Sequence, residues 1–157
     1  MNKTLSADIV HFLHNQGCVL VSTISKDGAP HNSCKGIIQI KPEGKIYLLD
    51  LYKGQTFANL SANPNISITA LNEHKFKGYC LIGKARIAAV GDFDQGLIKA
   101  WEDRVTSRIT QRVLKNISGE KGHPRHPESL LPEPKYVIVM EVKEIVDLTP
   151  HHLKQEA

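Results

Sequence analysis

The chain has 157 residues, of which 41% are hydrophobic and 23% charged, with a formal net charge of +4. This length predicts one domain that buries a core without disulfides or a structural metal. No apolar run reaches the ~18 residues of a membrane span, and the start is amphipathic, unlike a secretory signal. The three cysteines form no CxxC pair, and their odd number is typical of a reducing compartment. We therefore expect a cytoplasmic protein with no membrane partner.

The first third of the chain predicts a helix followed by an antiparallel meander. Ser6 is placed to cap a helix that ends at Gly17 and carries one apolar stripe. Turns are expected at Asp27-Gly28 and Glu43-Gly44, where glycine supplies the positive φ of a tight reversal. The β-branched runs around these turns predict strands at residues 18–25, 30–40 and 45–51.

The remaining elements alternate between helix and strand. A short helix over 56–60 is stopped by Asn63-Pro64, and strands follow at 66–71 and 78–90, with a bulge or bend at Gly83. The predicted order ends with a long helix at 92–117, a Pro-rich loop at 118–134 and a closing strand at 135–148. The long helix carries an apolar stripe from Leu97 to Leu114. This α-β-β-β-α-β-β-α-β order predicts a mainly β (α+β) fold, a small antiparallel barrel with helices in its gaps.

The sequence lacks most of the familiar catalytic and metal-binding motifs. No GxSxG, Walker or HExxH motif occurs. His123 and His126 lack a third ligand nearby, so we predict no metal site. Cys34 beside Lys35 is either an activated thiol or a small buried hydrophobe, and the second interpretation is favoured.

The long helix also carries a basic stripe. Its members are Arg104, Arg108, Arg112 and Lys115. Such a stripe either faces nucleic-acid phosphates or forms a solvated helix face, and acidic neighbours and a modest net charge favour the solvated face. We therefore expect no nucleic-acid partner.

Hydrogen-bonding residues concentrate in one region. Residues 30–35 open a strand with polar groups, Asp50 ends the next strand, and residues 52–56 lead into the short helix. A helix N-terminus presents unpaired N–H groups and the positive end of a dipole, so it suits a phosphate. Lys53, Gln55 and Thr56 add a charge and donors there, although simple helix capping explains such a cluster equally well.

The order of these pieces resembles the pyridoxamine 5'-phosphate oxidase-like family of FMN-binding split barrels. The resemblance rests on Asp27-Gly28-Ala29-Pro30, on Asn59-Leu60-Ser61-Ala62-Asn63-Pro64 and on Gly83-Lys84-Ala85-Arg86. It covers residues 5 to 90, with 135–148 as the expected closing strand. It implies a six-stranded antiparallel split β-barrel with flanking helices over residues 1–157, and a homodimer with FMN at its interface.

The resemblance also implies which residues meet the cofactor. Asn32, Ser33, Cys34 and Lys35 would approach the flavin, and Leu49 and Asp50 would run along the isoalloxazine edge. Gln55 and Thr56 stand where many members place a basic phosphate-binding pair, so Lys53, Ser33 and helix N–H groups would hold the phosphate instead. Trp101 and Tyr79 are candidates to cover a flavin face, and the alternative for Trp101 is a core anchor.

The departures from the family pattern narrow the expected activity. True pyridoxamine phosphate oxidases carry a C-terminal arginine and histidine for the vitamin phosphate, whereas here Arg125 and His126 precede the closing strand. We therefore expect an FMN-dependent oxidoreductase or electron-transfer protein with a small-molecule or protein redox partner, and no side chain is assigned as acid or base. The alternatives are an F420 site with basic surroundings, a haem site with His31 or His74 as axial ligand, or a regulatory domain without cofactor.

Overall fold

The computed structural model describes residues 1–126 and 134–154. Its centre is a closed barrel in which every strand pairs antiparallel with both neighbours, in the order β1-β2-β3-β6-β5-β4. The strands are β1 Val19–Ile24, β2 Pro30–Lys41, β3 Lys45–Asp50, β4 Asn65–Asn72, β5 Lys77–Ala89 and β6 Tyr136–Asp147. The predicted six-stranded antiparallel barrel is therefore confirmed.

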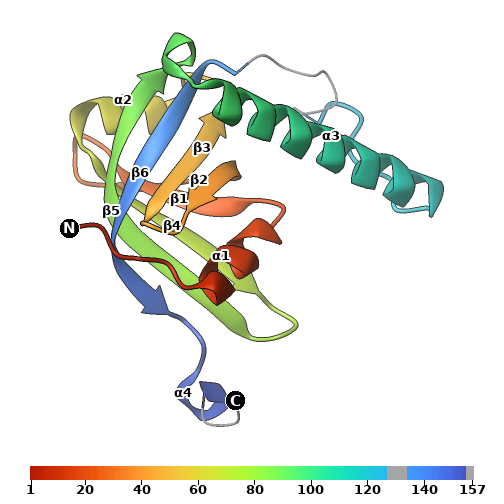
Figure 1. Ribbon diagram of the computed structural model, residues 1–157, viewed down its shortest axis with the longest axis horizontal. Helices are drawn as coiled ribbons and strands as arrows, with labels where there is room; N and C mark the ends of the chain where they lie inside the picture. Colours follow the sequence, from red (N-terminus) through yellow and green to blue (C-terminus); the bar gives the residue numbers. More distant parts are fainter. Residues whose placement is uncertain (127–133, 155–157) are drawn as a thin grey trace.

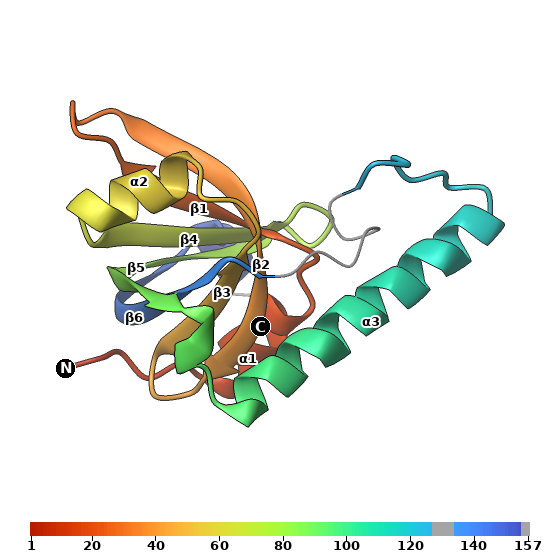
Figure 2. The same ribbon diagram turned by 90° about the horizontal axis from the view of Figure 1, so that it is seen from above.

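The helices lie around this barrel (Figure 1). They are α1 Ala7–His14, α2 Gln55–Ala62, α3 Gln95–Ile117 and α4 His151–Lys154, with a 3-10 turn at Val90–Asp92. Helix α3 begins beside the barrel and runs out past it, whereas α2 lies across another side (Figure 2). The short α4 was not predicted. Of the predicted Pro-rich loop, residues 127–133 lie outside the described residues.

Local signals account for the first elements. The Ser6 hydroxyl accepts a hydrogen bond from the Ile9 amide at 3.4 Å, so the predicted cap of α1 is confirmed. The predicted turns also form, with φ of +83° at Gly28 and +84° at Gly44, a region that L side chains seldom adopt. Leu13 on α1 is fully buried against the barrel core.

The closing pair β5–β6 contains the bulge that Gly83 suggested. Ile82 pairs with Glu144 and Gly83 with Val142, so the extra residue is Lys143 on β6. A Cβ atom at position 83 would collide with the backbone carbonyl oxygen of Glu141. Glycine is required here because the two backbones approach more closely than a side chain permits.

The apolar side chains form two separate clusters. One fills the barrel and includes Ile46, Leu48, Ile68, Leu81 and Met140. The other lies outside the barrel wall, where the first turns of α3 pack on it, and its members are Ile38, Ala88, Leu97, Val137 and Val139, with Trp101 packed against them. This second cluster fixes the N-terminal half of α3.

The far half of α3 departs from the expected apolar stripe. Val113, Leu114 and Ile117 are 50%, 60% and 78% exposed, and Leu97 is the buried residue of the helix. The periodicity correctly predicts a helix, but the helix extends past the barrel (Figure 2), and these three apolar side chains stay exposed.

The bulge leads to a test of barrel closure. We expect Gly83→Ala to lower the free energy of unfolding by about 1–3 kcal/mol, because the added methyl group forces β5 and β6 apart. Denaturant unfolding followed by circular dichroism measures the change. Gly17→Ala is the matched control, since a Cβ atom there meets nothing within 4 Å. Equal stability of both variants would contradict this account of Gly83.

Candidate functional site

A groove of about 590 Å³ lies between α3 and strands β2 and β3. Pockets of this volume commonly bind small molecules and cofactors. Its strand wall consists of Cys34, Lys35, Gly36, Ile37, Ile38, Leu49 and Asp50. Its helix wall consists of Trp101, Arg104, Val105, Arg108, Gln111, Arg112 and Lys115, and Gly17, Cys18, Leu51, Tyr52 and His126 complete the lining. The strand wall therefore combines apolar side chains with one lysine and one aspartate, whereas the helix wall is mainly cationic.

A buried polar network stands in the strand wall. The Lys35 ammonium lies 2.6 Å from the Asp50 carboxylate, and both side chains are only 9% exposed. The Tyr136 hydroxyl donates a hydrogen bond to the same carboxylate oxygen. Burial, followed by the hydrogen bond and the negative charge of Asp50, raises the pKa of Tyr136, so its phenol stays protonated and donates.

Strand register explains why these residues meet. Asp50 is the last residue of β3 and lies opposite Tyr136, the first residue of β6. Leu49 lies opposite Gly36, so Lys35 on β2 is adjacent to Asp50 across the β2–β3 ladder. A charge in this wall requires its partner, because an isolated buried ion is costly.

The arginines of α3 correct the prediction of a solvated helix face. Arg104, Arg108 and Arg112 are half-buried and line the groove. Arg104 donates to the carbonyl oxygens of His14 at 2.9 Å and Gln16 at 2.8 Å, at the C-terminal end of α1. Cations suit that end of a helix, and the contact ties α3 to α1. The guanidinium of Arg108 lies against the backbone of Gly36, where any side chain would meet it.

A second polar cluster surrounds the start of α2. The hydroxyls of Ser33 and Thr56 are 2.9 Å apart, and Thr56 is 3% exposed. Asn59 donates to the Thr23 hydroxyl at 2.9 Å and accepts from Gln55 at 2.7 Å. The N-cap residue is Gly54, which has no side chain that could cap the helix. This cluster joins α2 to β1 and β2 through hydrogen bonds that are already made.

The predicted flavin contacts therefore divide between two places. Cys34, Lys35, Leu49, Asp50 and Trp101 line the groove, and Ser33, Gln55 and Thr56 lie at the start of α2. The other two contact residues outside the groove: Lys53 lies just before α2, and Asn32 lies on β2. Lys53 places its ammonium 5.2 Å from the centroid of the Phe57 ring. Asn32 is exposed and accepts a hydrogen bond from Ser22 at 2.6 Å.

Two further interpretations are wrong. Cys34 is exposed, not a buried hydrophobe, because it lies on the outer face of β2. Tyr79 is buried and packs edge-on against Phe12 of α1 with 5.2 Å between ring centroids, away from the groove-lining residues. Trp101 both lines the groove and packs on the outer apolar cluster, so it anchors the helix as well.

Sequence reasoning placed Trp101 of α3 near the cofactor but missed the arginines of that helix and His126 as groove-lining residues. The signal for the arginines was present, since Arg104, Arg108 and Arg112 recur every four residues beside the stripe of Trp101 and Val105. No comparable signal marks His126, which lies in a loop. Among the described residues, His126 is the histidine that lines the groove, whereas His31 and His74 do not.

The family assignment follows from comparison with known proteins. The sequence profile described as pyridoxamine 5'-phosphate oxidase matches residues 5–146. The chain belongs to this family. No curated protein matches the chain. The similarities therefore establish the family and the fold.

Solved structures share the fold of this family member at low identity. HupZ from Group A Streptococcus has 19% identity and a TM-score of 0.63, covering 92% of this chain and 94% of its own. A protein from Clostridium acetobutylicum, described as related to general stress protein 26 and of the pyridoxinephosphate oxidase family, has 13% identity and a TM-score of 0.57, covering 91% and 92%. An F420 reductase has 14% identity and a TM-score of 0.57, covering 90% and 98%.

In residues 1–126 and 134–154, no helix is both long and apolar enough to cross a membrane. Over the same ranges, no three side chains of His, Cys, Asp or Glu are grouped to hold a metal ion.

The groove has donors and walls of the kind that FMN requires. Trp101, Leu49 and Ile38 offer apolar surface for a planar ring. Lys35 and the α3 arginines offer cationic donors for a phosphate. The hydroxyls of Ser33 and Thr56 already bond to each other, so a phosphate at the start of α2 has to displace that bond.

The buried ion pair leads to a test of the groove wall. We expect Asp50→Asn to lower the free energy of unfolding by about 3 kcal/mol, because it leaves the Lys35 ammonium buried without its anion. The double variant Lys35→Met/Asp50→Asn should recover most of that loss, since it removes both charges. Denaturant unfolding of the parent, both single variants and the double variant gives the coupling energy. Losses that simply add would contradict a coupled pair.

Proposed function

We propose that the protein is an FMN-binding oxidoreductase or electron-transfer protein that works with a small-molecule or protein redox partner. The observation that carries this proposal is the groove between α3 and strands β2 and β3, which gathers Cys34, Lys35, Leu49, Asp50 and Trp101. The resemblance assigned these same residues to the flavin. Membership in the pyridoxamine 5'-phosphate oxidase family supports a flavin ligand.

The groove residues have distinct parts in this proposal. FMN supplies the redox chemistry when bound, and the protein supplies binding, orientation and electrostatics. Trp101 and Leu49 would hold the ring and exclude water from one of its faces. The excess of positive charge along the α3 wall would favour a ligand that gains negative charge.

The departures from the family pattern count against oxidation of pyridoxamine phosphate, so the proposal does not extend to that reaction. The family's oxidases use a C-terminal arginine and histidine, and β6 carries neither residue type. His126 lines the groove from the loop that precedes β6.

F420 is the second candidate ligand, and the cationic face of α3 favours it. F420 has a long anionic tail, and Arg104, Arg108, Arg112 and Lys115 supply a cationic wall along the groove. The fold shared with an F420 reductase is consistent with this alternative.

FMN titration tests the cofactor. We expect the purified protein to show the visible absorbance of oxidised flavin, or to quench FMN fluorescence in a saturable titration. The Lys53→Ala/Thr56→Ala variant should bind FMN about 1–3 kcal/mol more weakly, because it removes a charge and a hydroxyl at the start of α2. Lys75→Ala, on the exposed β4–β5 turn, is the control.

The outcomes separate the ligands and the phosphate sites. Unchanged FMN affinity in the α2 variant would overturn the α2 phosphate site. The cofactor would be F420 instead of FMN if the parent protein binds F420 but not FMN, and if the Arg108→Ala/Arg112→Ala variant no longer binds F420. A protein that binds neither molecule would overturn the redox proposal and favour a non-catalytic domain.

We also propose that the protein is a homodimer with the cofactor at the interface. The exposed apolar end of α3 supports this arrangement, because Val113, Leu114 and Ile117 form a patch that a monomer would leave in water. The patch lies on the same helix as the cationic groove wall, so a second copy seated on it would stand next to the groove.

Oligomeric state provides the test of this patch. We expect Leu114→Lys/Ile117→Lys to weaken dimerisation by on the order of a hundredfold, because the ammonium groups would have to be buried. Sedimentation velocity over a concentration series measures the dissociation constant. Ser107→Lys, an exposed polar position on α3, is the matched control. A monomeric parent, or a variant that dimerises like the parent, would refute the arrangement.

A further inference from the structure

Two cysteines meet at the edge of the groove. The Sγ atoms of Cys18 and Cys34 are 3.4 Å apart, although sixteen positions separate the residues in the chain. Both line the groove, and both are exposed. We propose that Cys18 and Cys34 form a redox-active dithiol that closes to an intramolecular disulfide in response to low-molecular-weight disulfides.

The backbone around the pair favours closure. A disulfide requires about 2.0 Å between the sulfur atoms, so these two must approach by about 1.4 Å. Cys34 is held in the middle of β2, opposite Leu20. Cys18 lies just before β1, outside the strand ladder, and follows Gly17, where an added Cβ atom meets nothing within 4 Å. Closure would therefore be accommodated by residues 17 and 18, which precede the first residue of β1.

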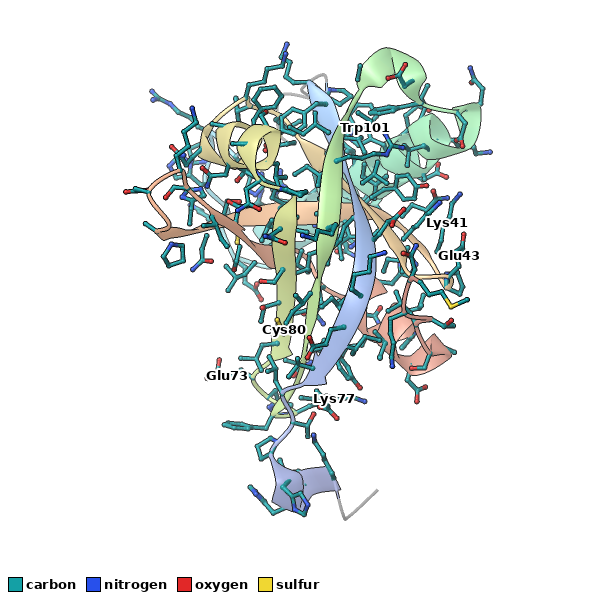
Figure 3. All side chains as sticks on the ribbon, turned by 90° about the vertical axis from the view of Figure 1, so that its left-hand side faces the viewer. Lys41, Glu43, Glu73, Lys77, Cys80 and Trp101 are labelled. Carbon is teal, nitrogen blue, oxygen red and sulfur yellow. The ribbon has the colours of Figure 1, made fainter. Side chains whose placement is uncertain are left out.

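The third cysteine has different surroundings. Cys80 lies within β5, between its ladder partners Thr69 and Val146, and is partly buried. Figure 3 shows it well away from Trp101, which lines the groove. Thiol–disulfide exchange requires access of the oxidant to sulfur, so Cys18 and Cys34 are the accessible pair.

The reaction balances with a small disulfide as the oxidant. The thiolate of one cysteine attacks a sulfur of glutathione disulfide, forms a mixed disulfide and releases one glutathione thiolate. The second cysteine, having lost its proton, attacks the protein sulfur of that mixed disulfide and releases the second glutathione. The protein loses two electrons and two protons, which the two glutathione molecules carry away. An excess of reduced glutathione reverses both steps.

Closure would change the groove itself. The bond would fasten the segment before β1 to β2 at the groove wall, beside Lys35 and Gly36. The redox state of the pair would thereby set the shape of that end of the groove. The inference rests on the two sulfur positions and does not depend on which cofactor binds.

Equilibration in glutathione buffers tests the proposal on the whole protein. As the ratio of oxidised to reduced glutathione rises, we expect the thiol count of the denatured, acid-quenched protein to fall from three to one. The intact mass should fall by about 2 Da with no glutathione attached. Cleavage after Lys26 and Lys35 places the two cysteines on separate peptides, which should be found joined.

Single variants provide the controls. Cys80→Ser should still lose two thiols and show the same small mass decrease. Cys18→Ser and Cys34→Ser remove one partner, so the remaining cysteine of the pair should gain one glutathione, about 305 Da, and form no crosslink. Circular dichroism of each variant establishes that it is folded.

Several results would overturn the inference. One is a wild-type protein that keeps three thiols, or that carries glutathione on both Cys18 and Cys34, in buffers that convert the dithiols of other proteins into disulfides. Another is a crosslink that joins two chains, seen as a doubled mass without reductant. A crosslink in Cys18→Ser or Cys34→Ser equal to that of the wild type would also overturn it.

Discussion

The insertion of β6 between β3 and β5 is the constraint on which the rest of the structure depends. The last strand of the described chain pairs with two strands that come much earlier, and without it the barrel would present two open edges. Open edges expose unpaired backbone groups, so closure satisfies both ladders at once. The bulge at Lys143 opposite Gly83 gives β6 the local bend that lets it follow β5. At Gly83 the backbones of this closing pair approach more closely than a side chain would permit.

Closure also assembles the polar wall of the groove. Tyr136 opens β6 and faces Asp50, and Asp50 holds Lys35. The Tyr136 ring packs edge-on against Phe57 of α2, with 4.9 Å between ring centroids. Tyr136 therefore contacts both Asp50 in the groove wall and helix α2, which follows β3 in the chain. The two polar clusters, at the groove and at the start of α2, are connected through it.

Helix α3 gives the barrel a surface that its strands do not supply. Its first turns pack on the outer apolar cluster, and its arginines turn toward β2 and α1. The end of the helix then extends past the barrel with its apolar residues exposed. A helix that is anchored at one end and uncovered at the other is typical of a chain that completes its packing in an assembly.

The sequence by itself determined the six strands, the helices α1 to α3, the strand turns, the Ser6 cap and the family, because these depend on local periodicity, on glycine conformations and on motif order. It also placed Cys34, Lys35, Leu49 and Asp50 in one region, since β2 and β3 are joined by a tight turn. Only the tertiary structure decided how α3 lies. The basic stripe of α3 is the same sequence pattern whether it faces water or a groove. Its contacts with α1 and β2 turn it toward the groove. The meeting of Cys18 with Cys34 likewise depends on the β1–β2 register and on the path of the chain before β1, which no local pattern encodes.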